Sequence, residues 1–506
     1  MYKGRFISAF LLLTFFNVSG QEVFQKVLNG PLDQLGCDII QTSDSGYVVA
    51  GTSRIASMQS EGFLTKLNRD GNISWTTTMG NVINYVVQTI NGDYVAAASV
   101  YLTPNNADIL LVKLNANGDT LWTKTYGDSL NNGPRSFSLL SDGGFLITSF
   151  SNNSGVIIRT DDTGVIQWST KITFPGILTL TCAAETPDHG FMIGGTIIDN
   201  GADGIILHVD SAGTILWVKN YDIGFNDLID GVTRTTDNYY VFGGTTDINM
   251  NVNIFLYKID ENANEIWLKS YQAGFGSDRF RSVIETKDYG FAITGLYDSV
   301  NDGDTYLLKT DSMGNYLWST SFGDANYNEA YSLAQTFDNG YILTGGTQKF
   351  TGQWEFDAHI IKTDSTGYSP CYQNLIADSD SNFTFIVTNV SPITTAGITE
   401  QYAQLSMGNF ISDSLWCFSY TGIEFIPSKD NLSVYPNPAN NFITIESSGI
   451  TDGTVLIYDD RGKLLKTEKF NGISRIEIKD LRNGLYIYRV ITANFHQFAG
   501  KFSVVK

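Results

Sequence analysis

The stretch KTDSMGNYLW, from Lys309 to Trp318, decides the fold, because versions of it recur along most of the chain. Asp311 stands two residues after Lys309, Gly314 three residues further on, and Trp318 four residues after the glycine. An Asp that bonds its own backbone and a Gly that adopts a positive φ together close a tight hairpin. We therefore interpret the stretch as two neighbouring strands of one sheet, with the tryptophan on the second strand.

Two markers repeat along the chain with a common period. The tryptophan recurs at steps of 46 to 51 residues, at Trp75, Trp122, Trp168, Trp217, Trp267 and Trp318. An aromatic residue that opens an apolar run recurs between them, at Tyr47, Tyr94, Phe145, Phe191, Tyr240, Phe291 and Tyr341. A period near 50 residues is the scale of a propeller blade. The chain is thus predicted to be all-β, with a seven-bladed β-propeller followed by a small C-terminal β-sandwich.

Each repeat reads as four short strands. In the unit 280–322 the second strand, FAITGLY, is apolar almost throughout, which is typical of a strand buried on both faces. Such burial occurs when sheets stack face to face, so we expect the repeated tryptophan to pack between neighbouring blades. The repeated lysine is expected to form a salt bridge between blades, not to act as a catalytic base.

The seventh repeat lacks its last strand. Cys371 stands where its tryptophan would be, next to Pro370. Residues 22–30, EVFQKVLNG, resemble the last strand of another repeat, LWTKTYGD, with Phe24 in place of tryptophan. Residues 22–29 are therefore predicted to complete the last blade, which would close the ring and remove its open edges.

Charge divides the 506 residues into two parts. Residues 427–506 hold 11 Lys and Arg against 8 Asp and Glu, a net +3, whereas the first 426 residues hold 21 against 44, a net −23. An acidic body argues against binding to nucleic acid or to anionic membranes. A basic tail on an acidic body indicates two modules with different tasks.

The termini and boundaries follow from composition. Residues 1–20 have a basic start, a short apolar stretch and small final residues, which is typical of a secretory signal peptide. The remaining boundaries are predicted as a propeller over 21–367, a β-rich extension over 368–426, a linker over 427–431 and a C-terminal module over 432–506.

Cysteines and metal ligands give limited signals. Cys371 and Cys417 lie in one region outside the repeats and are the predicted disulfide of an exported chain. Cys37 and Cys182 lie in different repeats and are expected to be buried thiols. No Cys or His spacing predicts a metal site or a cofactor. Acidic loops at 301–304 and 378–382 leave calcium open, although solvated acidic loops are common.

Three resemblances to known families follow from these motifs. The repeats resemble the tryptophan-docking motif of quinoprotein-type propellers, which is a packing motif and implies no quinone cofactor. They are also similar to the repeats of exported bacterial propeller proteins, a resemblance that implies no particular activity. The tail resembles the type A C-terminal sorting domain of the type IX secretion system, through Tyr435, Pro436, Asn437, Pro438, Gly462, Gly484, Tyr486 and Lys506.

The resemblance of the tail to a sorting domain implies an export route and partners. It implies export, contact with the type IX machinery and its sortase, and attachment to surface lipopolysaccharide after removal of the tail. We therefore expect the protein to be secreted and attached at the outer-membrane surface. We also expect it to be a monomer.

Function is predicted on the face that carries the loops between second and third strands and between blades, since these loops vary in length. The candidate ligand-binding residues there are Tyr101, Arg135, Phe225, Asp227, Arg279, Tyr327, Phe350 and Trp354. A non-catalytic module that binds a glycan or a protein is the main hypothesis. A structural coat protein and a glycan-active enzyme are the alternatives; no catalytic residue is predicted, because the 4 His form no triad or metal spacing.

Overall fold

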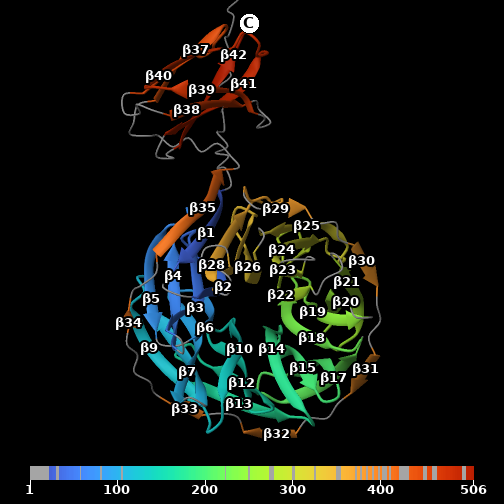
Figure 1. Cartoon of the computed structure of the whole chain (residues 1–506). Coiled ribbons are helices and arrows are strands. Elements are labelled where there is room, and N and C mark those ends of the chain that lie inside the picture. The colour runs from blue at the N-terminus through green and yellow to red at the C-terminus, as the bar shows by residue number, and fades with distance from the viewer. Residues whose placement is uncertain are drawn as a thin grey trace, which may run out of the picture. The chain divides into compact units, whose positions relative to one another are not determined.

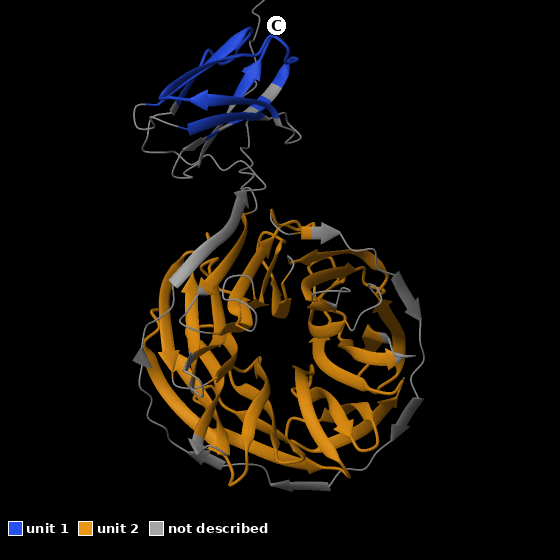
Figure 2. Ribbon diagram, in the orientation of Figure 1, with its two compact units in different colours: residues 1–21, 420–506 blue, residues 22–419 orange. Residues whose placement is uncertain are grey.

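The computed structural model divides the chain into two compact units (Figure 2). We call residues 22–419, which are orange and unit 2 in the key of Figure 2, the first unit, and residues 1–21 with 420–506, which are blue and unit 1 in that key, the second unit. The residues described are 22–29, 33–56, 59–79, 82–103, 106–222, 224–248, 251–272, 278–298, 303–323, 326–348, 355–370, 373–375, 379–382, 386–389, 393–396, 399–401, 407–408, 412–420, 432–447, 453–458, 464–492 and 497–506. Among these residues there is no helix of the length and apolarity that a membrane crossing needs.

Seven antiparallel sheets form the first unit, and we number them as blades 1 to 7 (Figure 1). Blades 1 to 3 contain β2 (Gln34–Gln41), β3 (Tyr47–Ala56), β4 (Gln59–Leu67) and β5 (Ile73–Met79); β6 (Val82–Gln88), β7 (Tyr94–Thr103), β8 (Asn106–Leu114) and β9 (Thr120–Gly127); and β10 (Asn132–Leu139), β11 (Phe145–Ser151), β12 (Ser154–Thr160) and β13 (Ile166–Thr173).

Blades 4 to 7 continue the pattern. They contain β14 (Ile177–Glu185), β15 (Phe191–Ile198), β16 (Ala202–Val209) and β17 (Ile215–Asp222); β18 (Asp227–Arg234), β19 (Tyr240–Ile248), β20 (Asn251–Ile259) and β21 (Glu265–Gln272); β22 (Arg279–Glu285), β23 (Phe291–Asp298), β24 (Gly303–Thr310) and β25 (Tyr316–Phe322); and β26 (Asn328–Gln335), β27 (Tyr341–Thr347) and β28 (Asp357–Thr363). The predicted seven-bladed propeller is confirmed.

The ring closes through the N-terminal strand. β1 (Glu22–Asn29) pairs antiparallel with β28, Phe24 opposite Lys362, and so supplies the fourth strand of blade 7. Phe24 is fully buried, and its ring meets Tyr47 of blade 1 edge to face with 6.1 Å between centroids. The prediction that residues 22–29 complete the last blade is confirmed.

The repeated tryptophans join each blade to the next. The Trp75 indole Nε1 donates a hydrogen bond to Ala116 O of blade 2 at 3.1 Å, and its ring lies 5.8 Å from that of Tyr94. Trp168, Trp267 and Trp318 make the matching ring contacts with the following blades. Gly118 has a φ of +88°, and a Cβ there would lie 3.0 Å from the Trp75 ring. The turn glycine therefore serves both the hairpin and the tryptophan of the preceding blade.

The repeated lysine forms its ion pair inside its own blade, not between blades as the sequence led us to expect. Lys66 Nζ lies 2.9 Å from Asp44, which sits in the turn between β2 and β3 of the same blade. Corresponding pairs join Lys309 with Asp288 and Lys362 with Asp338, each at 3.0 Å. The aspartate of the turn lies beside the third strand of its own blade, so it is the carboxylate nearest to the lysine.

Residues 373–420 add a fifth, outer strand to every blade (Figure 1). These strands are β29 (Gln373–Leu375), β30 (Ser379–Asn382), β31 (Ile386–Asn389), β32 (Ile393–Ala396), β33 (Thr399–Gln401), β34 (Met407–Gly408) and β35 (Ser412–Tyr420). They pair in chain order with blades 6, 5, 4, 3, 2, 1 and 7, so the segment runs round the ring against the order of the blades. We call 373–420 the belt. It covers the outer edge of each sheet, which would otherwise present unpaired backbone groups.

The second unit is a small two-sheet domain. One sheet has the order β36 (Leu432–Tyr435), β37 (Phe442–Ser447) and β40 (Ile473–Glu477); the other has β39 (Leu464–Phe470), β38 (Gly453–Tyr458), β41 (Gly484–Thr492) and β42 (Gln497–Val504). A core that includes Ile443, Val455, Phe470 and Phe502 lies between them. The predicted C-terminal β-sandwich is confirmed.

Candidate functional site

The innermost strand of every blade carries one β-bulge, always at the same repeat position. The skipped residue lies between Gly36 and Asp38 in β2, and in the corresponding place in the other six strands. A bulge turns its extra residue out of the ladder and re-aims the side chain. The seven bulge residues are Cys37, Asn84, Arg135, Thr181, Asp230, Arg281 and Tyr331.

All seven bulge residues line one cavity of about 670 Å³ at the centre of the ring. The repeat positions that hold the blades together vary little: the tryptophan is replaced only by Phe24, and the turn glycine only by Ala263. The bulge position instead carries six residue types in seven blades. Because the scaffold does not require variety there, we take this ring of side chains as the candidate functional site, and call it the bulge ring.

Several members of the bulge ring are held by neighbouring blades. The Arg281 guanidinium of blade 6 forms an ion pair with Glu329 of blade 7 at 2.6 Å and lies over the Tyr331 ring at 5.1 Å. The Tyr85 hydroxyl donates to Arg135 O, which ties blade 2 to blade 3. These contacts preorganise the polar groups around the cavity.

Asp38, next to the first bulge, joins three blades. Its carboxylate accepts a hydrogen bond from Ser332 Oγ of blade 7 at 2.7 Å and from Val86 N of blade 2 at 2.9 Å. Burial raises the pKa of Asp38, and these hydrogen bonds act in the opposite direction. Since its oxygens are already engaged, Asp38 is a positioning group of the ring.

Asp230 and Arg135 are the charged groups of the ring that remain available. Asp230 is half-buried, and burial raises its pKa while Arg281 and Arg135 oppose that rise. The exposed Arg135 guanidinium lies over the Phe150 ring at 4.9 Å and forms no ion pair with a carboxylate of the described residues. One carboxyl group and one guanidinium group therefore face the same cavity from blades 5 and 3.

A second cavity, of about 440 Å³, adjoins the first between blades 5 and 6. Asp230 and Arg281 line both cavities. Arg279, a candidate from the sequence, lines the second one and is exposed. Of the candidates from the sequence, Arg279 thus lies beside the bulge ring and Arg135 belongs to it.

The other candidates from the loop face are scattered. Tyr101 and Phe225 are 57% and 71% exposed, so they lie on the surface, whereas Asp227 is fully buried. Tyr327 is half-buried, donates its hydroxyl hydrogen bond to Glu329 at 2.9 Å, and packs on Phe356 with ring centroids 5.9 Å apart. Phe350 and Trp354 lie outside the described residues.

Sequence reasoning missed most of the bulge ring, since each of its members sits inside a strand. The signal that could have found it is the mixed chemistry of one aligned position among repeats that otherwise agree. This position is the fourth residue of β2, β10, β18 and β26.

The cysteines are only partly covered by the structure. Cys37 and Cys182 are free thiols that line the central cavity; Cys182 is buried and Cys37 half-buried. Burial raises the pKa of Cys37 to about 12, so this thiol stays protonated and is a poor nucleophile. Of the predicted disulfide, Cys371 and the side chain of Cys417 lie outside the described residues, as do residues 1–20 with their predicted signal peptide.

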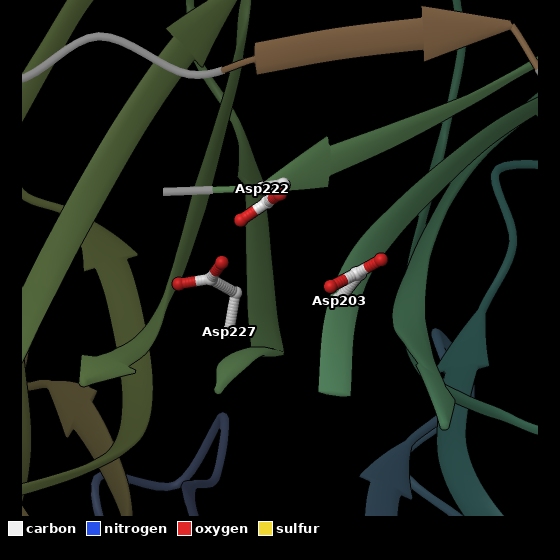
Figure 3. A group of neighbouring side chains, drawn as sticks. All are labelled: Asp203, Asp222 and Asp227. Carbon is white, nitrogen blue, oxygen red and sulfur yellow. The ribbon is translucent and has the colours of Figure 1, made fainter. Parts of the chain in front are cut away.

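Carboxylates gather at one junction of the ring. Oxygen atoms of Asp203, Asp222 and Asp227 all lie within 4.8 Å of one another (Figure 3). The acidic loops at 301–304 and 378–382, for which calcium was left open, do not include any of these three residues. Residues 301 and 302 and the side chains of 378–382 lie outside the described residues.

The sorting residues occupy defined places in the second unit. The Asn437 side chain accepts hydrogen bonds from Ser503 N and Oγ of β42, at 2.9 and 3.0 Å. The Tyr486 ring stacks on Phe502 at 5.7 Å, and Lys506 N donates to Asn483 Oδ1 at 2.8 Å. The Tyr435 hydroxyl donates to Glu446 at 2.7 Å. Gly462 lies outside the described residues.

Comparison with known proteins bears on the tail and on the fold. Residues 433–504 match the family described as the secretion system C-terminal sorting domain. The chain therefore carries a type IX sorting domain, which marks it for export to the cell surface or beyond. No protein among those of curated function matches the chain.

Solved structures are similar to the chain only distantly. Sqt1 from Chaetomium thermophilum is 10% identical with a TM-score of 0.37, over 68% of this chain and 99% of Sqt1. The extracellular domain of a protein described as a one-component system of B. thetaiotaomicron is 9% identical with a TM-score of 0.18, over 96% of this chain and 99% of that domain.

Proposed function

We propose that the protein is a non-catalytic binding module of the cell surface, whose central cavity takes a segment of a glycan. The observation that carries this proposal is the bulge ring, seven side chains of mixed chemistry on a rigid scaffold around one cavity of about 670 Å³. Ligand sites are typically cavities of several hundred Å³ with a few oriented polar groups.

The chemistry of the ring suits neutral, hydroxyl-rich ligands. The Asp230 carboxylate accepts hydrogen bonds, the Arg135 guanidinium donates them, and Asn84 does both. Tyr331 and Phe137 add aromatic surface for the apolar faces of sugar rings. A carboxyl group on one side of the cavity and a guanidinium group on the other offer both hydrogen-bond acceptors and donors, which favours a hydroxyl-rich glycan over an acidic peptide.

The sorting domain supports the cellular context. Its resemblance implies contact with the secretion machinery and its sortase, removal of the tail, and attachment of the propeller to surface lipopolysaccharide. A propeller held at the cell surface as a monomer would meet environmental glycans directly.

A glycan array probed with the full chain tests the proposal. Binding by the wild-type chain is expected to weaken by about ten- to a hundredfold in Asp230→Asn, because a hydrogen bond to a charged group contributes about 1.5–3 kcal/mol. The control Tyr101→Ala, on the exposed loop face, should bind as the wild type does. Binding of proteins but not of glycans would favour a protein ligand, and no binding at all would favour a structural coat protein.

A further inference from the structure

The junction of blades 4 and 5 brings three carboxylates together. Asp203 lies near the start of β16, Asp222 ends β17, and Asp227 begins β18 (Figure 3). Their oxygens lie within 4.8 Å of one another. Neither Asp203 nor Asp222 forms an ion pair with a Lys or Arg among the described residues. Burial and the charges of Asp203 and Asp227 raise the pKa of Asp222.

The repeat shows that this arrangement is local to one junction. Asp203 stands five residues before the repeat cation position, as Asp108 and Asp304 do in blades 2 and 6. In those blades the residue that corresponds to Asp222 is a glycine, Gly127 or Gly323. A Cβ at Gly127 would lie 2.1 Å from the Asp108 carboxylate, and a Cβ at Gly323 would lie 1.8 Å from that of Asp304.

The position of Asp227 also carries an additional carboxylate compared with blades 3 and 7. Asp227 begins β18, where Asn132 begins β10 and Asn328 begins β26. The junctions after blades 2 and 6 therefore combine one carboxylate with a glycine and an amide. The junction after blade 4 has a carboxylate at all three positions. Packing alone does not require the two additional charges, because the other junctions form without them.

Buried oxygens next to the carboxylates provide an independent observation. Thr246 is fully buried, and its Oγ1 has no hydrogen-bond partner among the described residues. Thr246 stands directly opposite Asp227 in the β18–β19 ladder, so the two side chains share one face of the sheet. Its Oγ1 lies 3.3 Å from the Cβ position of Gly224, whose N donates to Asp227 at 3.1 Å.

Asn220 adds a further oxygen. Its Nδ2 donates to Asp203 at 2.9 Å, while its buried Oδ1 has no partner among the described residues. Among the described residues, the junction thus holds carboxylate, hydroxyl and amide oxygens, and its group of possible metal ligands includes no His or Cys. Hard divalent cations prefer such a set of oxygens.

We propose that Asp203, Asp222 and Asp227 bind one Ca²⁺ ion, with Thr246 Oγ1 and Asn220 Oδ1 beside it. Ca²⁺ fits better than Mg²⁺, because the oxygens come from three separate strands in an irregular arrangement and Mg²⁺ demands near-octahedral geometry. The ion would neutralise the carboxylates and hold the end of β17 to the start of β18, thereby joining blade 4 to blade 5.

Calcium titration of the full chain, after treatment with EDTA, tests the proposal. Isothermal titration calorimetry should give one Ca²⁺ bound per chain, and Tm should rise with Ca²⁺ concentration. Asp222→Gly and Asp227→Asn install the residues that corresponding blades already tolerate, so both variants should fold. Each should bind Ca²⁺ at least about tenfold more weakly, because a carboxylate ligand is lost.

Comparison of Tm in EDTA with Tm in Ca²⁺ distinguishes Ca²⁺ binding by the three carboxylates from a purely structural role of these residues. In EDTA, Asp222→Gly should have a higher Tm than the wild type, because repulsion is relieved; in Ca²⁺ this advantage should shrink or reverse. Asp108→Asn, at the matching position of blade 2, is the control and should leave the Ca²⁺-dependent shift unchanged. No Ca²⁺ binding by the wild type, or an affinity that Asp222→Gly leaves unaltered, would overturn the proposal.

Discussion

The indole of Trp75 lies against Gly118 of the following blade, so that a Cβ at Gly118 would stand 3.0 Å from the ring. One contact thus connects the repeated tryptophan of one blade with the repeated turn glycine of the next. The glycine closes its own hairpin at a φ of +88° and gives the preceding tryptophan its packing surface.

Gly118→Ala is expected to destabilise the propeller by about 2–4 kcal/mol. About 1–2 kcal/mol comes from a positive φ in a residue with a Cβ, and the rest from overpacking against Trp75. Gly92→Ala is the control, since Gly92 has a φ of +85° but no atom within 4 Å of its Cβ position. It should show only the first cost in urea unfolding, and equal losses in the two variants would contradict this account.

Asp338→Asn is expected to destabilise the protein by about 2–4 kcal/mol, because it leaves the charge of Lys362 without its partner. The Lys362 side chain is only 1% exposed and pairs with Asp338 at 3.0 Å. The carboxylate charge of Asp338 is favoured by Lys362, and its pKa is lowered despite burial. The stability that this pair contributes is therefore present above the unfolded-state pKa of Asp, near 4, and is lost as the pH falls through the lower folded-state value.

Thermal unfolding as a function of pH checks this prediction. The wild type should lose stability below about pH 4 more steeply than Asp338→Asn. Parallel pH profiles for the two proteins would show that the pair does not contribute.

Asp108→Asn is expected to stabilise the protein at pH 7.5 by about 1–3 kcal/mol. Asp108 is fully buried, and burial, with the nearby charge of Asp128, raises its pKa to about 6. The folded state therefore holds a proton that the unfolded state has released between about pH 4 and pH 6, and stability falls as the pH rises through that window. The gain should be present at pH 7.5 and small at pH 4.5 by differential scanning calorimetry; an equal gain at both values would contradict the argument.

Deletion of the belt, residues 373–420, is expected to cause self-association. The belt pairs with the outer strand of every blade, and its loss would expose seven sheet edges. Light scattering after size-exclusion chromatography should show oligomers or aggregate. A chain that lacks residues 432–506 instead should stay monomeric, and a monomeric belt deletion would show that these edges are protected in another way.

The features that the sequence predicted are those that depend on local, repeated chemistry. The spacing from Asp311 to Trp318 encodes a hairpin and an interblade contact, and the missing tryptophan near Cys371 pointed to the N-terminal strand. Seven copies of one pattern determine a ring because each copy can bury its apolar strand only against the next.

Features that depend on pairing between distant strands were not predictable in the same way. The bulge at Arg135 is a property of the register between β10 and β11, and neither strand alone reveals it. The belt strand β30 has the polar sequence SDSN and pairs through its backbone, so hydrophobic alternation gives no signal. The repeat lysine was identified, but its partner depends on which turn lies nearest in space.

The most direct test of the central claim is the dissociation constant of Asp230→Asn for a glycan that the wild-type chain binds, compared with that of Trp354→Ala, which changes the loop tryptophan that was a candidate from the sequence. The bulge-ring account predicts that Asp230→Asn weakens binding by about ten- to a hundredfold and that Trp354→Ala leaves it nearly unchanged. Loss of binding in Trp354→Ala, with wild-type affinity in Asp230→Asn, would contradict the account and place the ligand on the variable loops.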